Sequence, residues 1–337
     1  MFVIDSRVVG GSNSQHTSIS VDSDDKIHIC YYDGMNQDLK YATNSSGVWK
    51  NYTLDGSGDV GQQNSIAVDS NNKVHISYCD NTKNSLKYAT NAGGAWTFDF
   101  VVRYAKSRMT SSIAIDSENR VYVCYQDPTS SELRYATRVN GSWTYHTIAA
   151  ADTNYHSIAI GSGDSLHVSY INQDRALTYA TNSNGTWTYQ VLDNARCWWC
   201  SIALGGGDDA HISYLAGTQD DRNIVKCASN ANGAWTNTTV FDGGVGSFNT
   251  GTSIAVDSEN KTHIGFFDSI SWNVMYATDE SGSWAVYLVD AGQYVGEGTS
   301  MTVDSLNNIH FTYFDSGKRD LTYATATAGP SQPHTQD

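Results

Sequence analysis

The sequence predicts an all-β fold in which one short unit is repeated seven times. A unit that reads S-I-A-V-D-S-x-N-K-V-H-I-S-Y-x-D, then L-x-Y-A-T-N-x-x-G-x-W, recurs through almost the whole chain. Within each copy, apolar and polar residues alternate with the period of two that strands require. The composition agrees, because only 16% of the 337 residues are charged and 21 are Tyr. The copies begin at Ser18, Ser65, Ser112, Ser157, Ser201, Ser253 and Ser300.

The second copy shows the four elements expected in every unit. Residues 65–69 (SIAVD) and 73–78 (KVHISY) alternate as two strands, which the turn DSNNK joins. Residues 86–90 (LKYAT) predict a third strand, and NAGG at 91–94 is the turn that leads through Trp96 into a fourth. Asn, Asp, Gly and Ser favour such turns because they tolerate the backbone angles required. Each unit is therefore predicted to be a four-stranded antiparallel meander.

The spacing of the units predicts how they assemble. Successive units start 44 to 52 residues apart, which with four strands per unit is typical of a β-propeller. Residues 2–5 (FVID) match the fourth-strand segment 287–290 (YLVD), whereas the seventh unit stops after its third strand. We therefore expect residues 1–17 to complete blade seven, which removes two exposed sheet edges. One seven-bladed β-propeller is predicted over residues 1–327, followed by a C-terminal tail at 328–337.

The first hairpin of the unit resembles known propeller repeats. AVDSNNKVHI, at 67–76, is similar to the start of NHL-type repeats and to the Asp-box repeats of sialidases and related lectins. An Asp box, however, places Ser-x-Asp-x-Gly-x-Thr-Trp between the last two strands of a blade. Here the Asp turn lies between the first two strands, and it lacks the Gly and the Trp. The resemblance implies the propeller fold and no particular activity.

Charge and hydropathy limit the partners and the location. The formal net charge of −15 argues against nucleic acid, since nucleic-acid binding needs clustered Lys and Arg. No run of about 18 apolar residues exists, so we expect no membrane insertion. The start of the chain, MFVIDSRVVGG, lacks the basic region and long apolar core of a secretory signal. We expect a secreted or cell-surface protein whose leader has been removed, with a leaderless cytoplasmic protein as the alternative.

One repeat position holds histidine in six of the seven blades, and blade three has Tyr122 there. Because these copies are a whole blade apart, we expect a buried Ser-His-Asp hydrogen-bond network in each blade rather than one metal or acid–base centre. The Asp of each DSxN turn is expected to cap the turn. No metal site and no cofactor is predicted, with calcium at these Asp residues as the alternative. The residues concerned are His28, His75, His167, His211, His263 and His310, and Asp22, Asp69, Asp116, Asp257 and Asp304.

The segment CWWC, residues 197–200, departs most from the repeat. A redox Cys-x-x-Cys motif takes its low thiol pKa largely from a helix N-terminus, and this segment instead enters a first strand. A zinc site would need two more ligands nearby. We interpret the segment as a hairpin, closed by a disulfide in an oxidising setting, that presents Trp198 and Trp199 beside Arg196. The other cysteines, Cys30, Cys79, Cys124 and Cys227, are expected to be buried free thiols.

The long variable loops of a propeller emerge on one face, and function is often carried by such loops on a rigid scaffold. Most of the arginines and the non-repeat aromatic residues fall there, which favours recognition of sugars or of carboxylates. The alternative is that these arginines pair with Asp residues of the same loops. The predicted ligand-binding residues are Trp198, Trp199, Arg196, Arg175, Arg222, Tyr104, Arg108 and Trp272.

The tryptophan of each unit has two interpretations. It packs between blades, or it stacks on a sugar in a groove between neighbouring blades. These residues are Trp49, Trp96, Trp143, Trp187, Trp235 and Trp284.

Three classes of function fit these residues. We favour a lectin-like protein that binds glycans, anionic ones included, because the chain lacks a short catalytic signature. The first alternative is an enzyme on acidic glycans, either a polysaccharide lyase with His156 or Tyr155 as base or a sialidase-like hydrolase with Glu297 as one carboxylate. The second alternative is a structural or adhesion scaffold.

Overall fold

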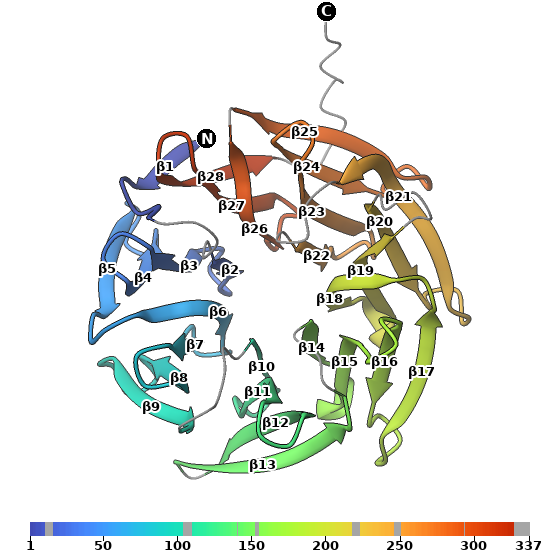
Figure 1. The fold of residues 1–337 in the computed structure, drawn as a ribbon, viewed down its shortest axis with the longest axis horizontal. Helices are drawn as coiled ribbons and strands as arrows, with labels where there is room; N and C mark the ends of the chain where they lie inside the picture. The colour runs from blue at the N-terminus through green and yellow to red at the C-terminus, as the bar shows by residue number, and fades with distance from the viewer. Residues whose placement is uncertain are drawn as a thin grey trace, which may run out of the picture.

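Seven four-stranded antiparallel sheets form a ring around a central opening, which confirms the predicted propeller (Figure 1). The structure is a computed structural model. It describes residues 1–10, 16–103, 110–139, 141–151, 155–217, 223–245, 251–292 and 294–326. Within these ranges the only helical elements are two single 3-10 turns, Ser162–Asp164 and Gly206–Asp208. None of the described helices is long and apolar enough to cross a bilayer.

Six of the seven blades run from an inner to an outer strand in chain order, and blade seven takes its outer strand from the start of the chain. Blade one contains β2 (Thr17–Val21), β3 (Ile27–Asp33), β4 (Asp38–Thr43) and β5 (Lys50–Asp55). Blade two contains β6 (Val60–Val68), β7 (Val74–Asp80), β8 (Ser85–Thr90) and β9 (Thr97–Val102). Blade three contains β10 (Ser111–Ile115), β11 (Val121–Asp127), β12 (Glu132–Val139) and β13 (Ser142–Ala149). Blade four contains β14 (His156–Ile160), β15 (Leu166–Ile171), β16 (Leu177–Thr181) and β17 (Thr188–Asp193).

The remaining blades repeat this order. Blade five contains β18 (Cys197–Leu204), β19 (Ala210–Gly217), β20 (Asn223–Ser229) and β21 (Thr236–Val245). Blade six contains β22 (Thr252–Val256), β23 (Thr262–Asp268), β24 (Asn273–Thr278) and β25 (Ala285–Ala291). Blade seven contains β26 (Val295–Val303), β27 (Ile309–Asp315), β28 (Asp320–Ala326) and, as its outer strand, β1 (Phe2–Asp5).

The N-terminal strand closes the ring as the sequence predicts. β1 pairs antiparallel with β28, with Phe2 opposite Tyr323 and Val3 opposite Thr322. The first and last strands of the chain therefore share one sheet (Figure 1). This pairing leaves the third strand of blade seven with no open edge. The predicted tail at 328–337 lies outside the described residues.

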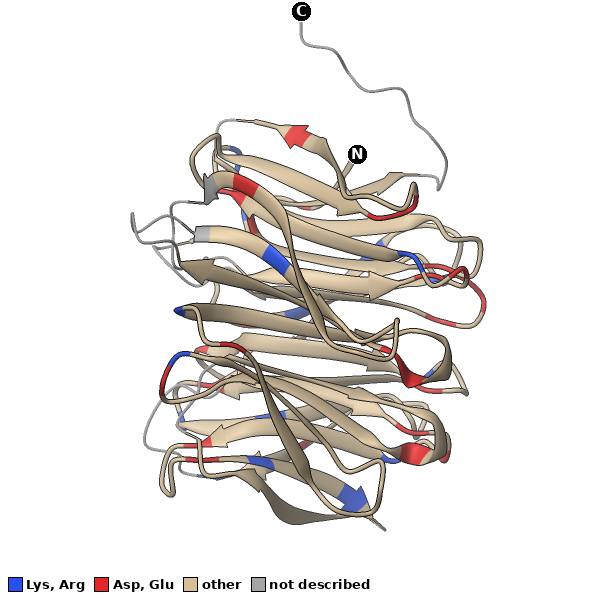
Figure 2. Cartoon of the chain, turned by 90° about the vertical axis from the view of Figure 1, so that its right-hand side faces the viewer, with Lys and Arg blue, Asp and Glu red and all other residues tan. Residues whose placement is uncertain are grey.

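The hydrophobic core lies between blades rather than within them. Seven apolar clusters are present in the described residues, and one of them joins Val8, Ile19 and Ile29 to Phe314 and Leu321 of blade seven. The second strand of a blade is covered on both faces by its neighbours, so β3 and β7 are buried along their whole length. The outer strand faces solvent, and β5 is exposed along most of its length. Charged residues lie mostly in turns and at strand ends, toward the two faces of the ring (Figure 2).

In six of the seven units, the opening serine joins neighbouring blades. The Ser18 hydroxyl accepts a hydrogen bond from the backbone N–H of Ile66, 3.3 Å away in blade two. The expected Ser-His-Asp network is therefore wrong about the serine, whose partner lies in the next blade instead of its own. The same bond joins Ile113 to Ser65, Ile158 to Ser112, Ile202 to Ser157, Met301 to Ser253 and Ile19 to Ser300.

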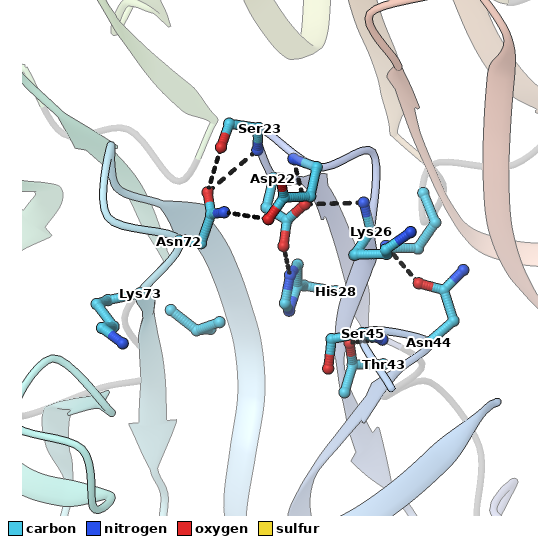
Figure 3. Close-up of polar contacts among 12 residues, drawn as sticks. Asp22, Ser23, Lys26, His28, Thr43, Asn44, Ser45, Asn72 and Lys73 are labelled. Carbon is cyan, nitrogen blue, oxygen red and sulfur yellow. Dashed lines mark hydrogen bonds and ion pairs between the residues drawn. The ribbon is translucent and has the colours of Figure 1, made fainter. Parts of the chain in front are cut away.

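A second ring of hydrogen bonds joins the first turns of the blades. In blade one, the N–H and the hydroxyl of Ser23 both donate to Asn72 of blade two, at 3.1 and 2.8 Å (Figure 3). Asn72 has a φ of 57°, a left-handed conformation that Asn and Asp tolerate better than most residues. Equivalent bonds join Ser70 to Asn119, Ser117 to Asp164, Ser162 to Asp208, Gly206 to Asn260, Ser258 to Asn307 and Ser305 to Asp25.

Candidate functional site

The repeated histidine belongs to a buried Asp-His-Tyr network. In blade one, Nε2 of His28 lies 2.9 Å from Asp22 Oδ2 (Figure 3). Nδ1 of His28 lies 2.6 Å from the Tyr41 hydroxyl. The other oxygen of Asp22 accepts the N–H groups of Asp24 and Lys26, so it caps the turn as predicted. Tyrosine from the third strand thus takes the place expected for serine. Blades two, six and seven repeat the network with His75, His263 and His310.

Burial governs the protonation of this network. Burial lowers the pKa of His28 below its ordinary value, although the Asp22 carboxylate opposes the shift. Burial raises the pKa of Asp22, but hydrogen bonds from His28 and from the turn N–H groups outweigh it and hold that pKa below its ordinary value. All polar atoms of these side chains have partners inside the protein. In the part of the chain that the structure describes, no three His, Cys, Asp or Glu side chains are grouped to hold a metal ion.

Three blades depart from the network. In blade three, Tyr122 donates to Asp116 directly at 3.0 Å. In blade four, Gly161 replaces the aspartate, and Ser165 lies 3.0 Å from His167 Nε2 instead. Blade five has Gly205 and Cys227 in place of the Asp and the Tyr, and Nδ1 of His211 lies 3.0 Å from Thr262 of blade six. The network therefore has a structural role, and three blades fill the same place with other side chains.

The repeated tryptophan packs between blades. Trp96 of blade two meets the ring of Tyr41 of blade one edge to face, with centroids 5.2 Å apart. Trp284 faces blade five, which lacks the tyrosine, and its Nε1–H donates to Thr238 at 3.2 Å. One interpretation of the sequence, packing between blades, is therefore seen directly. The equivalent pairs are Trp49 with Tyr323, Trp143 with Tyr88, Trp187 with Tyr135 and Trp235 with Tyr179.

On the opposite face, the turn between the second and third strands holds one exposed residue in a left-handed conformation. We call this the display position. Its side chain differs from blade to blade, and the position in blade five lies outside the described residues. The residues and their φ angles are Gln37 (63°), Asn84 (48°), Ser131 (56°), Arg175 (58°), Trp272 (58°) and Arg319 (67°).

The backbone at the display position is fixed by the next blade. The carbonyl of Gln37 accepts the N–H of Val60 at 3.0 Å, and the carbonyl of Arg175 accepts that of Cys197 at 2.7 Å. The side chain therefore projects from a held backbone into solvent. Two predicted ligand-binding residues, Arg175 and Trp272, occupy this position. In the sequence this position is recognisable only as a residue shortly before the third strand. The φ angles show that its backbone is left-handed in each described copy.

The CWWC segment is the start of strand β18, and the expected hairpin is wrong. The register shifts between Trp198 and Cys200, so Trp199 is an extra, bulged residue with a φ of 41°. Such a bulge turns the strand and separates neighbouring side chains. Trp198 is only 5% exposed and packs in the core between blades five and six, so the expectation that it is displayed is also wrong. Trp199 is half-buried and pairs with Tyr155, centroids 4.7 Å apart.

Both cysteines of this segment are free thiols. The Cys197 thiol donates to the carbonyl of Ala195 at 2.9 Å, and the Cys200 thiol donates to that of Tyr155 at 3.5 Å. Burial raises the pKa of each thiol to about 12. A redox motif needs the opposite shift. The two thiols of this segment therefore have a structural role rather than a redox role.

The guanidinium groups of two predicted arginines lie over the ring of Trp198. The guanidinium carbon of Arg175 lies 5.6 Å from the indole centroid, and that of Arg196 lies 5.1 Å from it. Both arginines are exposed, whereas the indole is buried. The structure thus brings together four of the predicted residues: Arg175, Arg196, Trp198 and Trp199.

A second group lies where blades six and seven meet. Trp272 and Tyr294 are 39% and 46% exposed, and their rings meet edge to face with centroids 4.8 Å apart. Phe267 lies beneath, 5.8 Å from the Trp272 ring. Ser316 connects the pair to a carboxylate, because its N–H donates to the Tyr294 carbonyl at 2.9 Å and its hydroxyl donates to Glu297 at 3.0 Å.

The remaining predicted residues lie elsewhere. His156 is 9% exposed, and its Nε2 lies 3.0 Å from Thr110. Burial lowers the pKa of His156 to about 4, and this geometry gives no support to its role as a base for a substrate. Tyr155 pairs with Trp199 at a half-buried position. Three further predicted residues, Tyr104, Arg108 and Arg222, lie outside the described residues.

Comparison with known proteins identifies similar folds. No protein-family profile and no curated protein matches the sequence. AofleA from Arthrobotrys oligospora is 12% identical with a TM-score of 0.62, over 87% of this chain and 89% of that chain. The SapL1 lectin in complex with alpha methyl fucoside is 14% identical with a TM-score of 0.62, over 83% and 97%. The Hadza microbial sialidase Hz136 is 12% identical with a TM-score of 0.53, over 97% and 68%. At these identities the likeness is one of fold, and the chain is a seven-bladed β-propeller similar in fold to lectins and to a sialidase.

Proposed function

We propose that the protein is a glycan-binding, lectin-like propeller. Its binding site in this proposal is the aromatic platform, which we define as Trp272, Tyr294, Glu297 and Ser316. The observation that carries the proposal is the exposed pair of Trp272 and Tyr294, 4.8 Å apart, beside a carboxylate that accepts a hydroxyl donor. The platform combines residues from the ends of blades six and seven.

The chemistry of the platform suits a sugar. A pyranose ring offers an apolar C–H face and a polar rim, so it stacks on an indole or phenol ring while its hydroxyls find acceptors and donors. Glu297 is half-exposed and supplies an acceptor, and Ser316 orients it. The platform as described, an exposed aromatic pair beside the oriented carboxylate of Glu297, suits sugar binding, whereas glycoside hydrolysis would also need a second carboxyl group placed for catalysis.

Backbone strain supports a role beyond packing. Trp272 has a φ of 58° and Tyr294 a φ of 71°. Bulky residues are uncommon in this conformation, which costs about 1–3 kcal/mol and is concentrated at functional sites. Other blades place Gln37, Asn84 and Ser131 at the display position, so the fold does not require tryptophan there. An aromatic side chain that is both strained and exposed is best explained by a ligand.

The similar structures suggest the first probe. SapL1 was solved with alpha methyl fucoside, so this sugar and a panel of neutral and acidic glycans are the ligands to test. Glycans of this kind are displayed outside cells, and the proposal therefore places the protein in a secreted or surface location.

The test combines a glycan array with titration calorimetry. The variant Trp272→Asn places the native residue of blade two at the display position, so it should fold normally and lose at least ten-fold in affinity for the best glycan of the array. Trp187→Phe, at an inter-blade packing position, is the matched aromatic control and should keep that affinity. An array without any ligand would overturn the proposal. So would Trp272→Asn binding as well as the wild type, and loss in Trp187→Phe alone would favour grooves between blades instead.

A further inference from the structure

We propose that the arginine pair, Arg175 and Arg196, forms a separate subsite that binds the anionic group of an acidic glycan. The group is a carboxylate or a sulfate ester, both of which present negatively charged acceptor oxygens. The inference rests on the proposed glycan binding and names a substrate class for it. The subsite lies at blades four and five, whereas the aromatic platform lies at blades six and seven.

The first argument is the convergence of two positive charges. Arg175 comes from the display position of blade four, and Arg196 comes from the segment that leads into β18 of blade five. Both guanidinium groups lie within 5.6 Å of the centroid of one indole ring, that of Trp198. Both arginine side chains are exposed, so two positive charges reach solvent beside one ring. Guanidinium groups also bind carboxylate and sulfate oxygens through paired hydrogen bonds.

The second argument is that the backbone holds both arginines in place. The carbonyl of Arg175 accepts the N–H of Cys197, and the carbonyl of Arg196 accepts the N–H of Gly217, each at 2.7 Å. The Trp198 indole beneath them is packed in the core, so its position is fixed by its neighbours. A site whose charges are held before binding loses less entropy when the ligand arrives.

The third argument is the charge around Arg175. The chain as a whole carries −15, yet no carboxylate of the described residues lies within ion-pair distance of Arg175. By contrast, Lys318, next to the display position of blade seven, is paired with Asp315 at 2.7 Å. Arg175 instead contacts the indole ring of Trp198, although the protein is rich in aspartate. Its guanidinium group is therefore suited to bind an anionic acceptor on a ligand.

The neighbouring aromatic pair extends the subsite. Trp199 directly follows Trp198, the residue whose ring lies under the two arginines. Tyr155 in turn pairs with Trp199. The arrangement offers an acidic sugar two cations for its anionic group and a half-buried aromatic pair for its ring.

The test compares matched charged and neutral ligands by calorimetry: methyl glucuronide, glucose 6-sulfate, methyl glucoside and inorganic sulfate. Wild type should bind one of the acidic sugars at least ten-fold more tightly than methyl glucoside, and 0.5 M NaCl should weaken that preference. Arg175→Gln and Arg196→Gln should each abolish it. The control is Arg319→Gln, which removes the same charge from the same display position in blade seven and should keep the preference.

Each outcome decides the inference. Preference for the sulfate ester or for the carboxylate supports the subsite and names its anion. Equal affinity for acidic and neutral sugars overturns it, as does an equal loss in Arg319→Gln, which would show an effect of net charge alone. Trp272→Asn distinguishes the two proposals, because it should lower affinity for neutral glycans and leave the acidic preference unchanged. If no sugar binds, binding of inorganic sulfate that Arg175→Gln removes still supports an anion site, and its absence overturns it.

Discussion

Ser305 of blade seven donates two hydrogen bonds to the carboxylate of Asp25 in blade one, 2.9 Å from its N–H and 2.7 Å from its hydroxyl. The two residues are 280 positions apart, and their contact completes the ring of turn-to-turn bonds. This contact closes the ring between blades seven and one, and the pairing of β1 with β28 completes blade seven itself. Blades two, three, six and seven use asparagine where blade one has Asp25: Asn72, Asn119, Asn260 and Asn307.

This contact predicts how the ring responds to substitution. Asp25→Ala should lower the free energy of unfolding by about 1–3 kcal/mol, because it removes a shared acceptor and places alanine at a φ of 56°. Asp25→Asn should change it by less than about 0.5 kcal/mol, since asparagine is the native residue in four other blades. Urea denaturation followed by tryptophan fluorescence measures both. Equal losses in the two variants would contradict the role of the acceptor.

The buried lysine between blades one and two predicts a larger effect. Lys87 forms an ion pair with Asp55, which also accepts the Tyr78 hydroxyl at 2.8 Å. Burial raises the pKa of Asp55, but the hydrogen bonds from Lys87, Ser57 and Tyr78 outweigh it and lower that pKa to about 2. Lys87→Met should cost about 3–5 kcal/mol, because it leaves a buried carboxylate without its cation.

Two variants test this explanation. The double variant Asp55→Val with Lys87→Met should recover at least half of the loss, because blade two has Val102 in the position of Asp55. The control Lys83→Met removes an exposed lysine 3.8 Å from Asp80 and should change stability by less than about 0.5 kcal/mol. If the double variant is no more stable than Lys87→Met, packing rather than charge explains the loss.

His156 predicts a pH dependence of stability. Its pKa is lowered by burial to about 4 in the folded protein, whereas the unfolded chain has the ordinary value near 6.5. The unfolded state therefore takes up a proton first as pH falls. Stability due to this residue is complete above pH 6.5 and is lost toward pH 4, by about 3 kcal/mol in all.

The measurement is urea denaturation between pH 7.5 and 4 for wild type and His156→Thr. Threonine is the native residue at the same place in blades one and six, Thr17 and Thr252. The difference in unfolding free energy between the two proteins should shrink or reverse as pH falls. Taking this difference cancels the titration of all other groups, which the two proteins share. Parallel pH profiles would show that His156 is protonated in the folded state as readily as in the unfolded state.

The six cysteines should be unreactive in the folded protein. Five are buried and Cys200 is half-buried, and the pKa of Cys197 and of Cys200 is raised to about 12, so the thiolate that reacts is scarce. A maleimide reagent should leave the native protein unlabelled and should label all six thiols in guanidinium chloride. Rapid labelling of native Cys200, or a mass that shows a disulfide after isolation, would contradict this placement.

The predicted features that the structure confirms are those that depend on residues close together in the chain. The strands, the turns, the seven blades and the closure by residues 2–5 follow from period-two alternation, from turn residues and from a repeat. The capping role of Asp22 was also predicted, because its N–H partners lie two and four residues away. The candidate site was predicted in part: Trp272 and Arg175 are exposed as expected, whereas Trp198 is not.

What failed depended on partners in another blade or on one extra residue. Ser18 was expected to bond within its own blade, but its partner is Ile66, 48 residues away. Alternation along β18 is interrupted by the bulge at Trp199, which no composition or spacing reveals, and a shift of one residue moves side chains to the other face of a sheet. The display position was likewise invisible, because it is defined by a φ angle.

By itself, therefore, the sequence determined the architecture of this protein, since each blade repeats the same local preferences. The tertiary structure decided which side chains are offered to a ligand. It buried Trp198 between blades five and six, brought Arg175 and Arg196 over it, and joined Trp272 to Tyr294 across the junction of blades six and seven. Exposure and proximity across blades depend on packing between segments that are distant in the chain, and local patterns carry no information about that packing.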